Sequence, residues 1–442
     1  MKNIKIVFFS LLISSFVKAQ DTLDLKQIIS IGLQNNYGIV IGNKKLEIAS
    51  INNTWANTGI LPTINISANS INKTTNYPDS KGTMAEIPYV ENTQNILSTG
   101  IALNWTIFDG LQPIIRKEKL ETLEAITEGN TAALVESNLQ AIILAYYKIL
   151  LEREKLQVYK VQLKISTDRY EYDKIKKEFG KASTYDLLQS QNAMLQDKTA
   201  FITQELNYQN AIKDLQLLLG VSANKQIVVA GLLPNNANEY SLGNLNSKMK
   251  ANNKNLRNQY LNIELMQNEE KLALREMYYP KLTMQAGAEL SDAAVNYNTT
   301  PALAQINNNS WNYYGNFALT FNLYSGGQKS RASKIAQINT KIAEVQTSEI
   351  EQTLDNQLSK LFELYLIRKE LLKLSNEMLA AAKLNYEMTE ERYKQGLINS
   401  FNYRDVQKMY LEIAIKQNEA LYNLIQTDTD LMRITGGILE TF

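Results

Sequence analysis

The segment Phe317–Gly327, which reads FALTFNLYSGG, decides the fold, and IALNWTIFDGL at Ile101–Leu111 is a second segment of the same kind. In both, apolar and polar residues alternate with the period of two that is typical of a strand with two different faces. A glycine lies at or near the end of each, and a very long segment of helical composition follows. The sequence therefore predicts strands that lead directly into long helices.

The composition favours extended regular structure. The chain has 442 residues with only 19 Gly and 7 Pro, and Lys+Arg 46 against Asp+Glu 45 leaves a net charge of +1. So few turn-forming residues favour long helices over many short elements. The balanced charge gives no indication of a nucleic-acid partner.

The absence of cysteine and histidine excludes several classes of function. Without these residues there can be no nucleophile activated by histidine, no thiolate or imidazole metal site and no disulfide framework. Neither GxxxxGK[ST] nor GxGxxG occurs. Chemistry that uses carboxylates alone stays open, but we expect no enzyme, with no catalytic residues, no cofactor and no metal ligands.

The first residues have the pattern of a signal peptide. Lys2 and Lys5 precede an apolar run at Ile6–Val17, and small residues offer a cleavage site before Gln20. Residues 1–19 are accordingly predicted to be removed on export. No later segment has 18 consecutive apolar residues, so we expect any membrane span to be made of strands.

An internal repeat organises the rest of the chain. The predicted first repeat is 20–220, the linker 221–240 and the second repeat 241–442. When the sequence is compared with itself at an offset of 216 positions, identical residues recur without a gap. At an offset of 217 positions, Asn35-Asn36 resembles Asn252-Asn253. The matching pairs include Ala102 and Ala318, Gly110 and Gly326, Tyr170 and Tyr386, Gly180 and Gly396, and Gly220 and Gly436.

Each repeat is expected to contain a helix, two strands, a very long helix and a shorter helix. The long helices are predicted at Pro113–Glu178 and Lys329–Gln395, each about 100 Å long at about 1.5 Å per residue. The shorter ones are predicted at Ser183–Leu219 and Asn399–Thr435. Apolar stripes at coiled-coil-like spacing predict helix seams; they comprise Leu139, Ile142, Ile143, Tyr146, Ile149 and Leu150 in one helix and Leu361, Phe362, Tyr365, Leu366 and Leu372 in the other.

The strands have features of a transmembrane β-sheet. All three tryptophans lie in or just before them and tyrosines gather at their ends, where aromatic rings meet lipid headgroups. Strands of a soluble sandwich would show the same alternation, so alternation alone does not decide between the two. The side chains expected to face lipid are Trp105, Ile107, Trp311, Phe317, Leu319 and Phe321.

Four strands cannot close a barrel alone. An open sheet in lipid leaves unpaired edge groups, each costing several kcal/mol. The chain is therefore expected to form oligomers in which several copies complete one barrel.

The order of these elements resembles the TolC-like outer-membrane efflux protein family over essentially the whole mature chain. The motifs that carry the resemblance are LPTI and YPKL before the first strands, WTIFDG and FNLYSGG after the second, EFGKASTYDLLQSQ and YKQGLINSFNYRDVQ at the helix breaks, and LLG and ITG at the repeat ends.

The resemblance implies a fold that is mainly α with a transmembrane β part: a homotrimer in the outer membrane, with a 12-stranded β-barrel and a long α-helical barrel extending into the periplasm. The implied partners are a periplasmic adaptor protein, an inner-membrane transporter and outer-membrane lipid.

The resemblance also places the two helix breaks at the periplasmic tip. It implies an adaptor docking surface and a gate around the three-fold axis, in which Asp186 and Tyr393 form a closing hydrogen bond and Asp405 rings the pore. Ser183-x-x-Asp186 equally fits a helix capping box. Two positions depart from the family's pattern: Lys177 occupies the position that Tyr393 has in the other repeat, and Asn402 stands where some relatives carry an acid. The docking residues are Gly180, Ala182, Gly396, Leu397 and Ile398, and the gate residues are Asp186, Tyr393, Asn402, Arg404 and Asp405.

Two functions of different classes are consistent with the sequence. The first is a passive export duct of a tripartite efflux or type I secretion system. The alternative is an exported helical scaffold or adaptor without a channel. Drugs, metal ions, dyes and proteins are all open as cargo.

Overall fold

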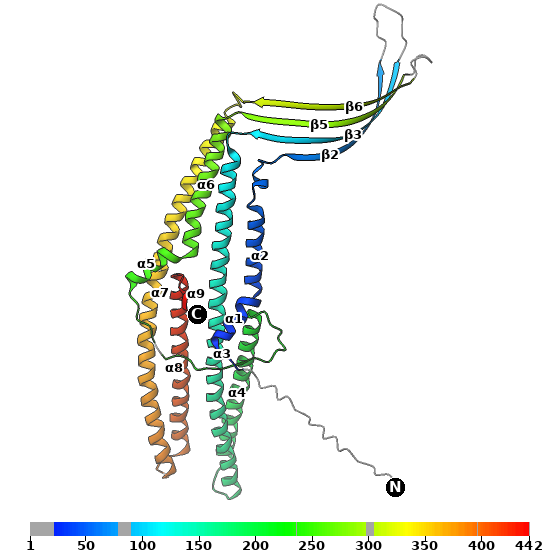
Figure 1. Ribbon diagram of the computed structural model, residues 1–442. Helices are drawn as coiled ribbons and strands as arrows, with labels where there is room; N and C mark the ends of the chain where they lie inside the picture. The colour runs from blue at the N-terminus through cyan, green and yellow to red at the C-terminus, as the bar shows by residue number, and fades with distance from the viewer. Residues whose placement is uncertain (1–21, 78–89, 236, 298–304, 396, 442) are drawn as a thin grey trace, which may run out of the picture. The chain divides into compact units, whose positions relative to one another are not determined.

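The computed structural model describes residues 22–77, 90–235, 237–297, 305–395 and 397–441 (Figure 1). The elements are β1 (Thr22–Leu23), α1 (Leu25–Asn35), α2 (Tyr37–Asn52), a short 3-10 helix η1 (Trp55–Thr58), β2 (Thr63–Tyr77), β3 (Val90–Phe108), α3 (Gln112–Glu178), α4 (Thr184–Leu218), β4 (Val228–Val229), α5 (Leu242–Asn252), α6 (Lys254–Tyr278), β5 (Lys281–Tyr297), β6 (Gln305–Thr320), α7 (Gln328–Lys394), α8 (Ser400–Ile434) and α9 (Ile438–Thr441).

The element order follows the predicted repeat, and the four long helices begin and end within one residue of the predicted limits. The predicted signal peptide and Gly396 lie outside the described residues. One boundary is wrong: β6 ends at Thr320, so Phe321 and Leu323 lie beyond the strand. The alternation continues through those residues, but they lead into the turn that starts α7 and no longer pair with β5.

The chain divides into two compact units, and each contains parts of both repeats. One unit holds the described residues up to Gly42 together with Ala132–Asn253 and the chain from Thr353 onward; the other holds Asn43–Thr131 and Lys254–Gln352. The helices α3 and α7 contribute residues to both units.

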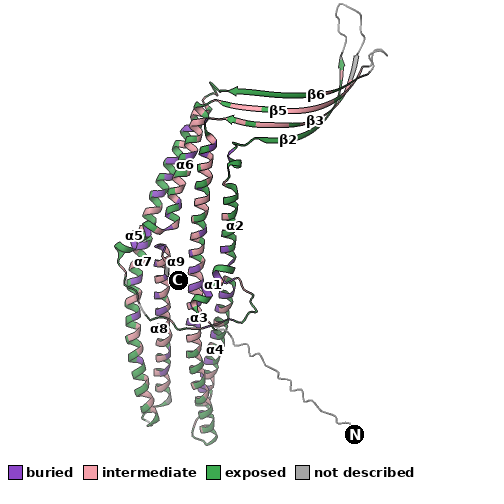
Figure 2. Cartoon of the chain, in the orientation of Figure 1, coloured by how far each residue is buried: buried purple, intermediate pink, exposed green. Residues whose placement is uncertain are grey.

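The second unit contains a four-stranded antiparallel sheet in the order β2-β3-β5-β6. The two inner strands are largely half-buried, whereas β2 and β6 are exposed along most of their length (Figure 2). Within the described part of the chain, each of these outer strands pairs along only one edge. The sheet is therefore open at both sides.

The strand register confirms that the sheet has one apolar and one polar face. Residues directly opposite one another share a face, and Ile64, Leu103, Ala286 and Gly315 form one such row. Apolar side chains dominate this face from the Leu282–Leu319 pair to the Leu290–Trp311 pair. On the other face the neighbouring row is polar throughout; it comprises Thr63, Asn104, Gln285 and Asn316.

A β-bulge changes the apolar face at the end of β3. The register shifts between Thr106 and Phe108, so that Phe108, not Ile107, pairs with Leu282. A bulge places an extra, unpaired residue in one strand. Period-two alternation alone had assigned Ile107 to this face. The contact of Ile107 with lipid stays a prediction.

A close helix crossing explains the one glycine inside the first long helix. A Cβ at Gly129 would overlap the amide of Asn258 on α6. That amide donates hydrogen bonds to the Ile126 carbonyl and to Asn130 Oδ1, at 3.3 and 2.8 Å. The glycine therefore lets a polar side chain of α6 reach the backbone of α3.

The core of the first unit lies where α1, α3, α4 and the linker meet. The predicted stripe on α3 is fully confirmed, since all six residues from Leu139 to Leu150 are buried. They pack with α1, α4, α9 and the linker through Ile28, Ile29, Leu215, Leu219, Val229 and Ile438. A stretch of α3 is long and apolar enough to cross a membrane by composition, but 44% of it is buried inside the protein.

The stripe on α7 is confirmed only in part. Tyr365 and Leu372 are buried, but Leu366 is 49% exposed. The apolar residues of α7 are spread over more than one face, so spacing alone did not identify which of them pack within the chain.

The linker is held by both long helices of the first unit. On α3, Tyr146 donates to the Ala230 carbonyl at 2.7 Å and Arg153 to the Val229 carbonyl at 3.0 Å. On α7, Tyr365 donates to the Asn238 carbonyl at 2.7 Å. Val229, Ala230 and Asn238 of the predicted linker are thus bonded to these two helices.

Candidate functional site at the helix tips

Similar turns follow the two longest helices. After α3, Gly180 has φ 69° and its N–H donates to Lys177, while the Lys181 N–H donates to the Lys176 carbonyl at 2.8 Å. This pair of bonds is a Schellman motif, which favours glycine at the left-handed position. After α7, the Leu397 N–H donates to the Arg392 carbonyl at 2.9 Å, at the same place in the repeat.

Helix caps follow both turns. At the start of α4, Ser183 Oγ donates to Asp186 Oδ2 at 2.7 Å and accepts from the Asp186 N–H at 3.1 Å. The Ser183 N–H also donates to Asp186 Oδ2 at 3.1 Å, and this bond together with the one from the Asp186 N–H forms the capping box. The hydrogen bonds from Ser183 lower the pKa of the Asp186 carboxyl. At the start of α8, Asn399 Oδ1 accepts from the Asn402 N–H at 2.9 Å.

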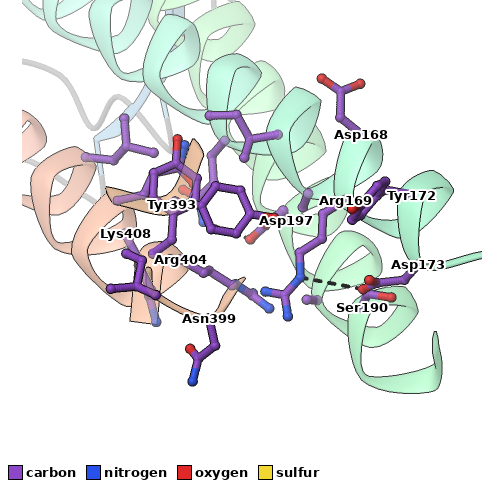
Figure 3. A pocket seen from close by; sticks show the side chains of 18 of the residues that line it. Asp168, Arg169, Tyr172, Asp173, Ser190, Asp197, Tyr393, Asn399, Arg404 and Lys408 are labelled. Carbon is purple, nitrogen blue, oxygen red and sulfur yellow. Dashed lines mark hydrogen bonds and ion pairs between the residues drawn. The ribbon is translucent and has the colours of Figure 1, made fainter. Parts of the chain in front are cut away.

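A groove of about 830 Å³ lies just behind these tips, within the first unit (Figure 3). Its walls come from α3 and α4 on one side and from the end of α7, the turn and α8 on the other. The described residues that line it are Gln162, Ile165, Ser166, Asp168, Arg169, Tyr172, Asp173, Lys176, Ser190, Ala193, Asp197, Tyr393, Lys394, Ile398, Asn399, Tyr403, Arg404, Gln407, Lys408 and Leu411.

The groove brings together only some of the predicted site residues. Tyr393, Ile398 and Arg404 line it. The others that the structure describes do not: Gly180, Ala182, Asp186, Leu397, Asn402 and Asp405. Within the described chain, no hydrogen bond joins Asp186 to Tyr393, because the Asp186 carboxylate bonds to Ser183.

A tyrosine cluster beside the groove was missed from the sequence. Tyr393 stacks on Tyr403 with ring centroids 4.7 Å apart, Tyr386 stacks on Tyr410 at 5.3 Å, and the hydroxyls of Tyr386 and Tyr403 lie 3.1 Å apart. Burial raises the pKa of Tyr403. The seven-residue spacing within each helix was the available signal. In the first repeat the equivalent positions hold Tyr170, Lys177, Leu187 and Met194.

Polar side chains buried between α3 and α4 were also missed. Asp197, 7% exposed, accepts a hydrogen bond of 2.7 Å from Gln162 Nε2, and Arg169 Nε lies 3.7 Å from Asp173 Oδ2. Among the described residues, no group of acidic side chains has the arrangement of a metal site. The described part of the tip therefore offers charged and aromatic side chains.

Comparison with known proteins agrees with this architecture. The family model for outer membrane efflux proteins matches residues 245–437. No curated protein matches the sequence significantly. Solved structures with the same fold include CusC, with 14% identity, a TM-score of 0.73 and coverage of 93% of this chain and 92% of that one.

Two further structures are similar to the same extent. The Campylobacter jejuni CmeC outer membrane channel has 17% identity and a TM-score of 0.70, covering 93% of this chain and 85% of that one. The open state of the Neisseria gonorrhoeae MtrE outer membrane channel has 13% identity and a TM-score of 0.69, covering 94% of this chain and 89% of that one.

Proposed function

We propose that the chain is the passive exit duct of a tripartite efflux or type I secretion system, and the match of residues 245–437 to the outer membrane efflux protein family supports this proposal. The family consists of outer-membrane efflux channels, which are not enzymes. The finer proposal is that an adaptor docks at the periplasmic tip and an inner-membrane transporter supplies the driving force.

The open sheet supports assembly of three copies. The outer strands β2 and β6 each pair along one edge in the described chain, and hydrocarbon cannot satisfy the remaining N–H and C=O groups. Joining β2 of one copy to β6 of the next gives a closed barrel of 12 strands from four strands a chain. In that barrel the apolar face meets lipid and the polar face lines the lumen. This open sheet is the observation that carries the proposal.

Exposed apolar stripes on the helices support the same assembly. On α4, Leu188, Leu195 and Ile202 recur every seven residues and are all exposed. On α7 an exposed stripe with heptad spacing comprises Leu364, Ile367, Leu371, Leu374 and Met378. Such stripes are typical of coiled-coil seams. We propose that α4 of one copy packs against α7 of the next to complete the α-helical barrel.

The turn residues supply the proposed docking surface for the adaptor. Leu397 is 70% exposed, and a Cβ at Gly180 would have no neighbour within 4 Å. Exposed apolar groups at a chain reversal are suited to contact a partner. The gate proposal assigns Asp186 and Tyr393 to a contact between copies and Asp405, with Asn402 and Arg404 nearby, to the mouth of the pore.

The test is assembly and conductance of the purified full-length protein. We expect heat-modifiable trimers in the outer membrane and ion-conducting pores in planar bilayers. Recovery of a monomer in the soluble periplasmic fraction would favour the scaffold function instead.

Docking has a separate test. The change Leu397→Asp is expected to abolish export from cells while leaving trimers and conductance intact. Lys181→Asp, at the equivalent position of the first repeat, shows whether a negative charge added at either tip is sufficient to stop export. Normal export by Leu397→Asp would remove this turn from the docking surface.

A further inference from the structure

Two arginines from different hairpins point toward one another in the groove behind the tips (Figure 3). Arg169 lies on α3 and Arg404 on α8, so that the first and second repeats each contribute one guanidinium group. Like charges facing each other across a partly enclosed space repel one another. An anion placed between the two groups would reverse this repulsion.

The hydrogen-bond donors of Arg169 are incompletely used. Its Nε lies 3.7 Å from Asp173 Oδ2, which is too long for a hydrogen bond. Both Nε and Nη1 are buried, and neither has a hydrogen-bond partner in the described chain. Buried donors of a charged group are costly to leave unpaired. An oxyanion would supply the acceptors that these donors lack.

Arg404 has no acidic partner among the described residues, although it is partly buried. The neighbouring acids are directed elsewhere: Asp197 accepts from Gln162 at 2.7 Å, and Asp168 points away from the other labelled side chains (Figure 3). Three further cations line the groove, namely Lys176, Lys394 and Lys408. The lining has five cations and three acids, and part of this positive surplus is balanced by Glu390 beside Lys394 at 3.2 Å and by Glu412 beside Lys408 at 3.7 Å.

The remaining walls favour a ligand with a ring. Tyr172 and Tyr393 line the groove together with apolar side chains, and its volume of about 830 Å³ is in the range of small-molecule sites. Guanidinium groups bind carboxylates through paired hydrogen bonds, which a point charge cannot reproduce.

We propose that the groove binds a small aromatic carboxylate, with its carboxylate between Arg169 and Arg404 and its ring against Tyr172 and Tyr393. Because both repeats contribute an arginine, the bound anion would tie the two hairpins together. The proposed binding rests on the geometry of one chain and does not depend on the export function.

The test uses full-length protein in detergent and 4-fluorobenzoate, observed by fluorine NMR. We expect saturable binding that the neutral analogue 4-fluorobenzamide does not reproduce. Arg404→Gln should weaken the affinity about tenfold to a hundredfold, since one charge-assisted contact is lost. Arg404→Lys should retain part of the affinity, because it keeps the charge without the planar pair of donors.

The matched control is Arg392→Gln, which removes the same charge from the last turn of α7, at a residue outside the groove lining. It should bind like the unaltered protein. Equal weakening by Arg392→Gln and Arg404→Gln would overturn the proposal, because the anion would then respond only to net charge. If inorganic phosphate displaced 4-fluorobenzoate as effectively as unlabelled benzoate does at the same concentration, the proposed role of the ring would be overturned. Loss of the ordered fold in Arg404→Gln would show in its circular dichroism, and Arg404→Lys would then carry the comparison.

Discussion

The side-chain amide of Asn253 donates a hydrogen bond of 2.9 Å to the carbonyl oxygen of Ile434, 181 residues further along the chain. The first repeat contains the same contact, from Asn36 to the Leu218 carbonyl at 2.7 Å. Each contact joins the start of a repeat to its last helix. In each repeat the Asn-Asn motif supplies the donor of this contact, and LLG or ITG supplies the carbonyl that accepts it.

Removing this contact should destabilise the first unit. Asn253 is 7% exposed, and Asn253→Ala removes the donor to a buried carbonyl, at a cost of about 1–3 kcal/mol. Thermal unfolding followed by circular dichroism in detergent measures the loss. The exposed Asn255 provides the control, since Asn255→Ala should change the midpoint little. Equal midpoints for the two variants would show that the contact contributes nothing to stability.

Two glycines with similar backbone angles should respond differently to alanine. Gly180 and Gly220 have φ 69° and 63°, but a Cβ would meet nothing at Gly180 and would overlap the Asn35 carbonyl at Gly220. Gly180→Ala should cost about 1–2 kcal/mol from left-handed strain. Gly220→Ala adds about 1–3 kcal/mol of overpacking. The same thermal assay compares them, and an equal loss would mean that the Asn35 backbone moves aside freely.

The two faces of the sheet should tolerate arginine unequally. Leu103 lies in the middle row of the apolar band and Asn104 on the polar face beside it. Leu103→Arg should cost about 2–4 kcal/mol and reduce assembled trimer. Asn104→Arg should assemble normally, as judged by heat modification on gels. Leu319 lies at the end of the band, so Leu319→Arg should cost less stability, about 0–1 kcal/mol. Equal damage at Leu103 and Asn104 would contradict the assignment of the faces.

An ion pair between the buried Glu152 carboxylate and the exposed Lys148 should make stability depend on pH. Burial acts to raise the pKa of Glu152, but hydrogen bonds from Lys148 and Gln204 outweigh it and the pKa is lowered overall. A depressed carboxyl pKa stabilises the fold above the unfolded-state value and loses that contribution as pH falls through the folded-state value. Glu152→Gln should therefore unfold at a lower temperature at pH 7.

The difference between Glu152→Gln and the unaltered protein should shrink as the pH falls below about 4.5, where an unperturbed glutamate becomes protonated. Glu154→Gln is the matched control, because Glu154 lies beside Arg153 at 3.5 Å and its side chain is 34% exposed. A constant difference from pH 7 to pH 3 would show that the Glu152 charge is not involved.

Conductance measurements distinguish a role of Asp186 in the gate from its role in the helix cap. Asp186→Ala with Tyr393→Phe should raise the conductance of purified trimers if the two residues hold neighbouring copies closed. Asp405→Asn should weaken cation preference, because a ring of three carboxylates attracts cations. If the double change alters only thermal stability and ion selectivity is unaffected by Asp405→Asn, then Asp186 acts solely as the cap of α4.

The sequence was informative about elements and much less so about the tip groove. Prolines, glycines and apolar spacing located the long helices because these features act through the local backbone. The groove depends on side chains from α3, α4, α7 and α8, and nothing near Arg169 or Asp173 in the sequence indicates which helix lies opposite. The bulge at Ile107 was missed for a related reason, since register is a property of two strands together.

The contacts at Asn36 and Asn253 also determine when each repeat can close during folding. Their partners lie 182 and 181 residues away, so each of these contacts closes a very long loop of the chain. Such long-range pairing is slow, and apolar surface stays uncovered until the last helix of a repeat has been made. The start of the second repeat waits for α8 in the same way. A chain released before Leu218 or Ile434 would lack the contact that joins the two ends of that repeat.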